Sequence, residues 1–254
     1  MLVLFAFSPS AAAARITAGA TAFTVTLDNG RELSGFALKG AILDVVIAGQ
    51  PARIRIANIW RDKLNSDVLL HDFRWINANG SESIMCPAGP DGTRAGFPVE
   101  GRSNAAGEIV ASTDGHFELT CTAGAQGKCL RFGYKPWKMA SNRASLRDYY
   151  NACIHLMRAD YAGDGHATTR DGTLIDIYDH IGIQQEVPDP HHKFTFEAAF
   201  GKNGATCVAH PRVREHVTLK QLAQDVPRLV GHLGPHGCTE ASAGSEALVF
   251  VKSR

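Results

Sequence analysis

The sequence predicts an α+β fold that is predominantly antiparallel β-sheet, built as a sandwich or a rolled sheet and braced by disulfides. Three observations lead to this prediction. Short stretches rich in β-branched and aromatic residues recur between turns over 21–134. One segment, 145–158, carries apolar residues at helical spacing. The chain also has six cysteines, and an even number is typical of a disulfide-braced protein in an oxidising compartment.

The first expected unit is a β-rich region over 15–135. TAFTVTL and RELSGFAL flank Asp28-Asn29-Gly30, and because Asn-Gly readily takes the positive φ angles of a tight turn, these stretches predict a hairpin. Further segments of strand composition, bounded by Gly, Pro or Asn, are AILDVVIAG, ARIRIANIW, VLLHDFRWI and HFELTC. Regularly spaced short strands favour a sandwich or a rolled sheet.

The second expected unit is an α+β region over 136–254 that packs on the first. Its main helix is predicted near 145–158, with Ser141 or Asn142 as the N-cap. TLIDIY, FTFEAAF and EALVFVK have the composition of strands. TLKQLAQDV indicates a short C-terminal helix that stops near Pro227.

Composition and the N-terminal residues bear on location and partners. With 44% hydrophobic residues, 20% charged residues and a net charge of +1, the chain lacks the strongly basic surface typical of nucleic-acid-binding proteins. Residues 1–14, MLVLFAFSPSAAAA, are similar to a signal peptide without its basic start, with cleavage near Ala14. This run is too short to span a membrane. We therefore expect a periplasmic or secreted protein that is not transmembrane and binds no nucleic acid.

The cysteines are disulfide candidates, because none has the CxxC spacing of a zinc or redox site. The candidates are Cys86, Cys121, Cys129, Cys153, Cys207 and Cys238. We expect Cys121 to pair with Cys129, on neighbouring strands, and Cys207 to pair with Cys238. Cys86 and Cys153 are then a third pair or two free thiols.

The stretch RADYAGDGHATTRDGTLIDIYD, 158–179, is the main candidate for a functional site. It holds five aspartates and one histidine directly after the predicted helix. Hydrolytic chemistry needs two carboxylates, one ionised and one with a raised pKa. The catalytic candidates are Asp160, Asp164, His166 and Asp171. The structural alternative is that these aspartates initiate turns, since Asp-Gly pairs are common turn formers.

The same stretch partly fits a calcium-binding loop. With Asp160 at the first position of an EF-hand-like loop, Asp164 takes the fifth, Gly165 the sixth and Asp171 the twelfth. The third position is Ala162, which offers no oxygen ligand, and a strand rather than a helix is expected to follow. The pattern favours a turn, and Ca²⁺ is the one cofactor left open.

A cysteine-dependent enzyme is a further alternative. In a hydrolase, Cys153 would act as thiolate, His155 or His166 as base and Asp176 as orienting group. His236-Gly237-Cys238 is similar to the short motif of L,D-transpeptidases. A disulfide at each cysteine explains these residues more simply.

Several separated motifs resemble one known family. Lys128-Cys129, GYKPW, Cys153, RADY followed by GDG, TRDGT, FEAAF and GATCV occur in this order and are similar to the ADYC-domain family of exported bacterial proteins. The resemblance implies an extracytoplasmic compartment and no particular mechanism. The naming motif ends in cysteine, whereas this chain has Ala162 after Tyr161. If that cysteine forms a disulfide in the family, its partner in this chain is a free thiol or is absent. Cys153 is the first candidate for that partner.

The predicted function is an exported, disulfide-stabilised binding or structural module, with a cell-envelope glycan or protein as partner. The alternatives are a hydrolase or transferase that uses the Asp/His loop 160–176 on a cell-wall or glycan substrate, and a cysteine-dependent transpeptidase-like enzyme. Burial separates these hypotheses, because convergent and partly buried carboxylates beside a cleft favour an enzyme, whereas splayed, solvent-facing ones favour the module.

Overall fold

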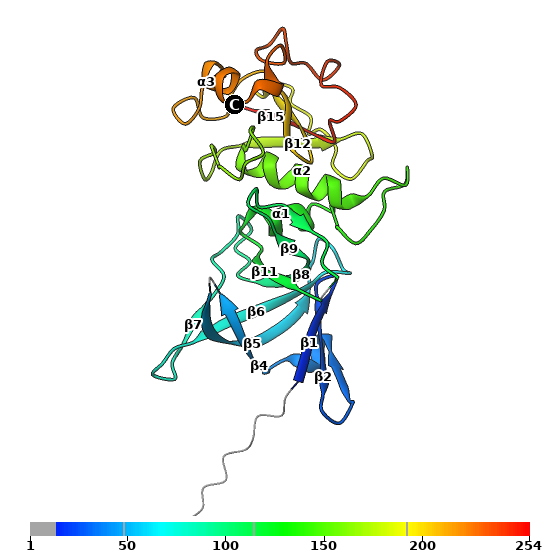
Figure 1. The fold of residues 1–254 in the computed structure, drawn as a ribbon, viewed down its shortest axis with the longest axis vertical. Helices are drawn as coiled ribbons and strands as arrows, with labels where there is room; N and C mark the ends of the chain where they lie inside the picture. The colour runs from blue at the N-terminus through cyan, green and yellow to red at the C-terminus, as the bar shows by residue number, and fades with distance from the viewer. Residues whose placement is uncertain (1–13, 48, 114, 192) are drawn as a thin grey trace, which may run out of the picture.

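The computed structural model describes residues 14–47, 49–113, 115–191 and 193–254, so the expected signal peptide lies almost entirely outside the described chain. The described residues form antiparallel sheets with three α-helices, which confirms the predicted α+β class. Figure 1 shows an elongated molecule with the N-terminal strands at one end and the C-terminal sheet at the other. Helices α1 (Ala125–Arg131) and α2 (Leu146–Arg158) lie between them (Figure 1).

The N-terminal part contains two main sheets. The smaller has the order β1 (Ala14–Gly19), β2 (Ala22–Leu27), β3 (Glu32–Ser34) and is followed by the 3₁₀ helix η1 (Gly35–Leu38). The larger has the order β11 (Phe117–Cys121), β8 (Gly96–Glu100), β6 (Leu69–Ile76), β5 (Gln50–Arg61), β4 (Ile42–Ile47), and β7 (Glu82–Ile84) also pairs with β6. A separate two-stranded ladder joins β9 (Arg102–Ser103) and β10 (Ile109–Val110).

The first predicted hairpin is confirmed as β2 and β3. Gly30 has a φ of +77°, and the Asn29 side chain accepts a hydrogen bond of 3.0 Å from the N–H of Arg31, which closes the turn. The unpredicted strand β1 pairs with the other edge of β2.

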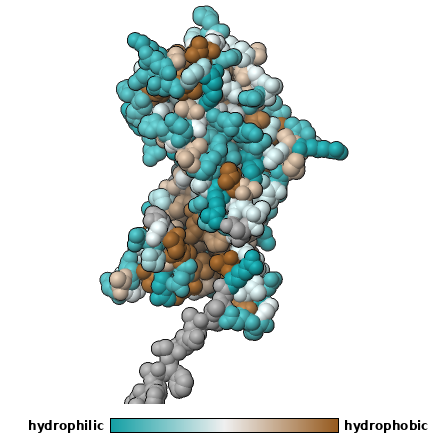
Figure 2. All heavy atoms as spheres, in the orientation of Figure 1, coloured by the Kyte–Doolittle hydropathy of each residue, from teal (hydrophilic) through white to brown (hydrophobic). Residues whose placement is uncertain are grey.

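The core of the N-terminal part lies between the two sheets. Phe23 of β2, Ile54 and Ile56 of β5 and Phe73 of β6 are buried in one cluster. In β5 the two isoleucines are separated by half-buried Arg55, the alternation expected of a strand with one face in the core. Figure 2 shows that apolar side chains also gather on the visible face of this part, below the helices.

The C-terminal sheet has the order β12 (Ile175–Asp179), β15 (Val249–Ser253), β13 (Thr195–Gly201), β14 (Gly204–Val208), and every pair in it is antiparallel. Helix α2 packs on one face, where Leu156 shares a buried cluster with Phe200 and Val251. A second cluster includes Tyr178 and Phe250. Helix α3 (Leu219–Asp225) and the 3₁₀ helix η2 (Pro227–Leu229) follow β14.

Both predicted helices are confirmed, with one correction at an N-cap. The N-cap of α2 is Ser145, whose hydroxyl accepts a hydrogen bond of 3.2 Å from the N–H of Arg147. Ser141 and Asn142 are not caps, because Asn142 instead accepts from Ala144 within the preceding turn. Thr218 caps α3 through a complete capping box.

The cysteines form three disulfides, Cys86–Cys121, Cys129–Cys153 and Cys207–Cys238, and leave no free thiol in the described chain. The pairing of Cys207 with Cys238 is confirmed. The pairings Cys121–Cys129 and Cys86–Cys153 are wrong, because Cys129 lies in α1 rather than on a strand and faces Cys153 of α2. Cys121, at the end of β11, is left to bond Cys86.

Candidate functional site

Asp160 organises the loop that follows α2. The helix ends at Ala159, which has a φ of +49°, and Asp160 is buried directly after it. Its carboxylate accepts backbone hydrogen bonds from Gly163 at 2.9 Å, Asp164 at 3.2 Å and Gly165 at 2.9 Å. This side chain therefore fixes the path of residues 159–166, which we call the ADY loop.

His155 of α2 is fully buried between two carboxylates. Its Nδ1 lies 2.9 Å from Asp160 Oδ2, and its Nε2 lies 3.1 Å from Glu108 Oε1. Burial opposes the charged imidazole, but the hydrogen bonds with Asp160 and Glu108 raise the pKa of His155 overall. Burial also opposes the Asp160 carboxylate, yet the hydrogen bond from His155 lowers the pKa of Asp160. The cluster joins α2 to Glu108 of the N-terminal part, and within it the side chains of His155 and Asp160 are fully enclosed.

The other predicted catalytic residues do not converge on Asp160. Asp164, His166 and Asp171 are all exposed, and Asp164 accepts the N–H of His166 at 2.8 Å in a local turn. Asp176 is buried in β12, where burial raises the pKa of its carboxyl group and the N–H of Val187 donates to it. Of the four catalytic candidates, Asp160 is therefore inside the protein and the other three are on its surface.

Tyr161 connects the ADY loop to a buried ion pair. Its hydroxyl donates to Glu197 Oε1 at 2.9 Å and accepts from the N–H of Arg212 at 2.8 Å. The guanidinium of Arg212 binds both oxygens of Glu197, at 2.9 and 3.0 Å, and also donates at 2.9 Å to the carbonyl of Leu156 near the end of α2. These groups are buried and mutually hydrogen-bonded, as a charge pair inside a protein requires.

Ala162, the position of the missing cysteine, lies against Arg228. The guanidinium of Arg228 donates to the carbonyls of Tyr161 at 3.0 Å and Ala162 at 2.9 Å, and also to that of Asn203 at 3.0 Å. Burial lowers the pKa of Arg228. The expectation that Ala162 leaves Cys153 free is wrong, because Cys153 bonds Cys129.

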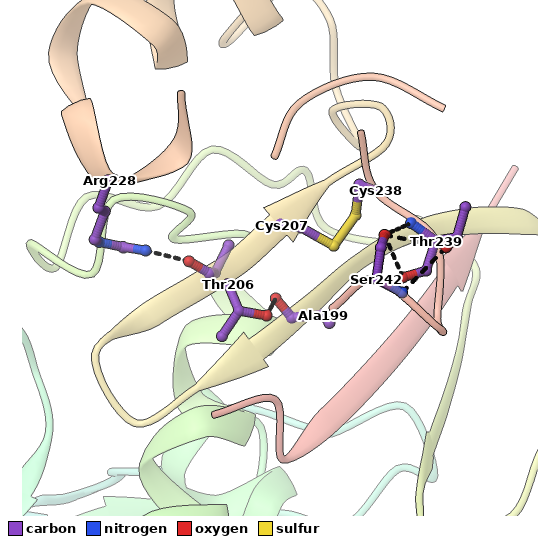
Figure 3. Close-up of a disulfide and its surroundings, with 8 residues drawn as sticks. Ala199, Thr206, Cys207, Arg228, Cys238, Thr239 and Ser242 are labelled. Carbon is purple, nitrogen blue, oxygen red and sulfur yellow. Dashed lines mark hydrogen bonds between the residues drawn. A yellow bond between two sulfur atoms is a disulfide. The ribbon is translucent and has the colours of Figure 1, made fainter. Parts of the chain in front are cut away.

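The cysteine hydrolase and the transpeptidase-like enzyme considered from the sequence both require a free thiol as nucleophile. Cys153 and Cys238 are both in disulfides and both buried. Figure 3 shows Cys207 of β14 joined to Cys238, beside a turn in which Thr239 and Ser242 exchange hydrogen bonds. In this state neither sulfur can act as a thiolate.

A cleft of about 1050 Å³ opens beside the C-terminal sheet. It is lined by the start of β13, most of the segment 209–215, the start of α3, residues of the loop 235–240 and Arg254, and we call it the C-terminal cleft. The wall of the cleft includes Arg212, whose backbone N–H donates to the hydroxyl of Tyr161. Arg212 therefore links Tyr161 to the cleft. A second cavity of about 590 Å³ adjoins the β13–β14 turn and includes Arg228, which is held by backbone carbonyls.

The charged groups of the C-terminal cleft differ in whether they have partners. Glu240 accepts hydrogen bonds of 2.9 Å from the Tyr178 hydroxyl and from His180 Nε2. Burial raises the pKa of Glu240, but these two bonds lower it overall. Arg214 and Glu215 form no ion pair within the described residues.

Arg254 also lines the cleft without a carboxylate partner among the described residues. Its guanidinium lies over the ring of Phe194, 4.7 Å from the centroid. Nearby, His210 Nε2 is 3.0 Å from the hydroxyl oxygen of Thr195.

The comparison with family models decides the relationship of this chain to known proteins. The model of the ADYC domain matches residues 30–214. The chain belongs to the ADYC-domain family. The ADYC match starts within the β-rich region and ends at Arg214, so it includes the ADY loop, Glu197 and Arg212. Searches of curated proteins and of solved structures found no match.

Two features are absent from the described residues of this ADYC chain. No helix in the described residues is long and apolar enough to cross a membrane. No group of three or more His, Cys, Asp or Glu side chains in the same residues is arranged to hold a metal ion.

Sequence reasoning missed the buried ion pair and the lining of the cleft. A signal for the pair was present, because Glu197 interrupts the apolar strand FTFEAAF, and a charge in such a strand needs a partner. Nothing in the sequence identified Arg212 as that partner. Arg214 and Arg254 stand in no recognisable motif, and only the fold places both in one cleft.

Proposed function

We propose that this ADYC protein is an exported binding module of the bacterial cell envelope and that its ligand site is the C-terminal cleft. The observation that carries the proposal is the contact from Tyr161 through Arg212 to the cleft wall. The signature tyrosine is buried, and we assign it the role of holding Arg212 and Glu197 in place behind the binding surface.

Export is supported by the three disulfides and by the signal-like residues 1–14. Disulfides form and persist in oxidising compartments and are rare in the reducing cytosol. The periplasm or the extracellular space is accordingly the proposed location.

Binding is favoured over catalysis by the placement of the candidate residues. Asp160 is enclosed with His155, while Asp164, His166 and Asp171 are exposed and separate from it. The C-terminal cleft, in contrast, combines apolar surface with a few polar and charged groups, which is typical of ligand sites.

The proposal is tested by blocking the cleft. The chain exported to the periplasm would be mixed with soluble peptidoglycan fragments and with lipopolysaccharide-derived oligosaccharides, and binding would be followed by ¹H–¹⁵N NMR. We expect shifts at cleft residues such as Thr218 and Thr239, and we expect Leu219→Trp to abolish them. Leu174→Trp, at an exposed leucine outside the cleft lining, controls for the added tryptophan side chain, and the melting temperature of Leu219→Trp shows that this variant at a partly buried position still folds. Shifts that persist in Leu219→Trp would place the binding site elsewhere and overturn the proposal.

A further inference from the structure

Resting on the proposed function, we infer that the C-terminal cleft binds an acidic glycan and that Arg214 and Arg254 pair with the carboxylates of its uronic acid residues. Two properties of the cleft support this assignment. Some of its charged side chains have no ion-pair partner among the described residues, and its walls offer no fully open strand edge.

Two cationic side chains of the cleft are available to a ligand. Arg212 also lines the cleft, but its guanidinium is held by Glu197 and by the Leu156 carbonyl. Arg214 and Arg254 have no carboxylate partner among the described residues. A guanidinium recognises a carboxylate through two parallel hydrogen bonds, so these two side chains favour a carboxylate-bearing ligand.

The acidic groups of the cleft limit how much negative charge a ligand brings. Glu240 is engaged by Tyr178 and His180, which leaves Glu215 as the carboxylate without an ion pair in the described lining. The negative charge of Glu215 would repel a ligand whose negative charges are closely spaced. The cleft therefore favours a ligand with carboxylates spaced along it, as in a chain of uronic acids.

An extended peptide finds no fully open sheet edge in the cleft. Thr195 and Phe196 of β13 pair with β15 on one side, while on the other side the ladder with β14 begins at Ala198. The segment after β14 also returns to β13, because the N–H groups of Ala209 and His210 donate to the Glu197 carbonyl. Peptides that bind by strand addition need an unpaired edge, so recognition here falls to side chains.

The remaining lining suits a sugar. Thr195, Thr218 and Thr239 are exposed at the cleft. Their hydroxyl groups already bond His210, Gln221 and Ser242, and each keeps one acceptor position for a sugar hydroxyl. Phe196 and Leu219 supply apolar surface. Sugars present hydroxyls at their edges and C–H groups on their faces, and they match both kinds of surface. The volume of about 1050 Å³ is large enough for a short oligosaccharide rather than a single ring.

The experiment compares three probes on the full exported chain by isothermal titration calorimetry at low salt. Trigalacturonate is the acidic sugar, maltotriose is the neutral sugar of equal length, and triglutamate is the acidic peptide. We expect trigalacturonate to bind, maltotriose to bind at least about tenfold more weakly, and triglutamate not to bind, since charge-assisted hydrogen bonds to each guanidinium contribute on this scale. Added salt should weaken the interaction.

Variants assign the effect to the two arginines. Arg214→Ala and Arg254→Ala should each weaken trigalacturonate binding by about tenfold with an unchanged melting temperature, because both side chains are exposed. Arg170→Ala, at an exposed arginine outside the cleft, should bind as the parent chain does. An equal loss in Arg170→Ala would show unspecific charge attraction and overturn the inference.

The other outcomes separate this inference from the proposed function. If maltotriose binds as tightly as trigalacturonate and Leu219→Trp blocks both, the cleft is a ligand site but the acidic preference is wrong. If triglutamate binds best, the ligand is an acidic peptide and the inference is wrong. If no probe binds, the acidic-glycan inference fails, and the peptidoglycan and lipopolysaccharide fragments then decide the proposed function.

Discussion

The hydroxyl of Tyr161 donates a hydrogen bond of 2.9 Å to the carboxylate of Glu197, and both side chains are buried. Burial, followed by the charge of Glu197, raises the pKa of Tyr161 well above its usual value. The tyrosine therefore stays neutral and acts as a hydrogen-bond donor. Because Arg212 also donates to Glu197, the signature tyrosine completes a charge pair that joins α2, β13 and the cleft wall.

The first prediction concerns this hydroxyl group. Tyr161→Phe should lower the free energy of unfolding by about 1–3 kcal/mol, because Glu197 loses a donor and the Arg212 N–H loses its acceptor. Tyr150→Phe is a matched control, since Tyr150 is equally buried but its hydroxyl has no hydrogen-bond partner among the described residues. Urea unfolding of both variants measures the difference. A loss of equal size in Tyr150→Phe would contradict a specific role for the Tyr161 network.

The second prediction separates two aspartates of the ADY loop. Asp160→Ala removes the acceptor of three backbone N–H groups and the partner of a buried imidazole, and should destabilise the protein by about 3–5 kcal/mol. Asp164→Ala removes one exposed turn contact and should change stability by no more than about 0.5 kcal/mol. Thermal unfolding monitored by circular dichroism makes the comparison. Similar values for the two variants would argue against Asp160 as the organiser of the loop.

The sequence predicted strands where apolar residues alternate and failed where the chain departs from that pattern. β8 is absent from the predicted strands, because Gly96 and Pro98 disfavour strand structure. The strand tolerates Pro98 because its pairing with β6 is confined to Gly96. Helix α1 was missed because Gly127 disfavours helix, yet any side chain there would collide with the carbonyl of Cys121.

The site was predictable in its residues but not in its contacts. The motif drew attention to Asp160 and to Tyr161, and an acidic stretch next to glycines correctly indicated a turn. The partners of Tyr161 are Glu197 and Arg212, which lie 36 and 51 positions away in the chain. Local sequence patterns carry no information on these contacts. The contacts depend on how β13 and the segment after β14 pack against α2.

The third prediction is a loss of stability in mild acid that depends on His71. This side chain is fully buried and stacks on Phe73, and among the described residues its ring nitrogens make no hydrogen bond of normal geometry. The effect of burial on its pKa is only partly opposed by the backbone of Gly96 and Leu69. Burial lowers the pKa of His71 to about 4, whereas an unfolded histidine has a pKa of about 6.5. The unfolded chain therefore takes up the proton first as the pH falls. The stability that neutral His71 contributes is fully present above about pH 6.5. As the pH approaches 4, the free energy of unfolding falls by up to about 3 kcal/mol.

Replacement of His71 tests the source of that pH dependence. His71→Phe keeps an aromatic ring beside Phe73 but removes the titrating group, so its stability should fall less steeply than that of the parent chain between pH 6.5 and pH 4. The measurement is urea unfolding at a series of pH values. Parallel curves for the two proteins would show that another group carries the acid sensitivity. His155 is no such group, because its raised pKa gives a contribution that is present at low pH and lost as the pH rises.

The fourth prediction is the disulfide map. Intact mass of the exported protein should be unchanged by alkylation under native conditions and should show six modified thiols after reduction. Peptide mapping should recover Cys86–Cys121, Cys129–Cys153 and Cys207–Cys238. A peptide that joins Cys121 to Cys129 would contradict the placement of Cys129 in α1. Six freely alkylated thiols in the native protein would argue against an oxidising compartment.

The last prediction is that EDTA leaves the melting temperature unchanged. A calcium ion in the ADY loop would need the oxygens of Asp160, but Oδ1 already accepts from the N–H groups of Gly163 and Asp164, and Oδ2 from Gly165 and His155. Calcium ligands are free oxygen lone pairs, and here hydrogen-bond donors take the positions that a cation would need. Differential scanning calorimetry with EDTA and then with added CaCl₂ makes the comparison. A large drop that calcium reverses would mean that the loop rearranges to release Asp160 from its backbone partners.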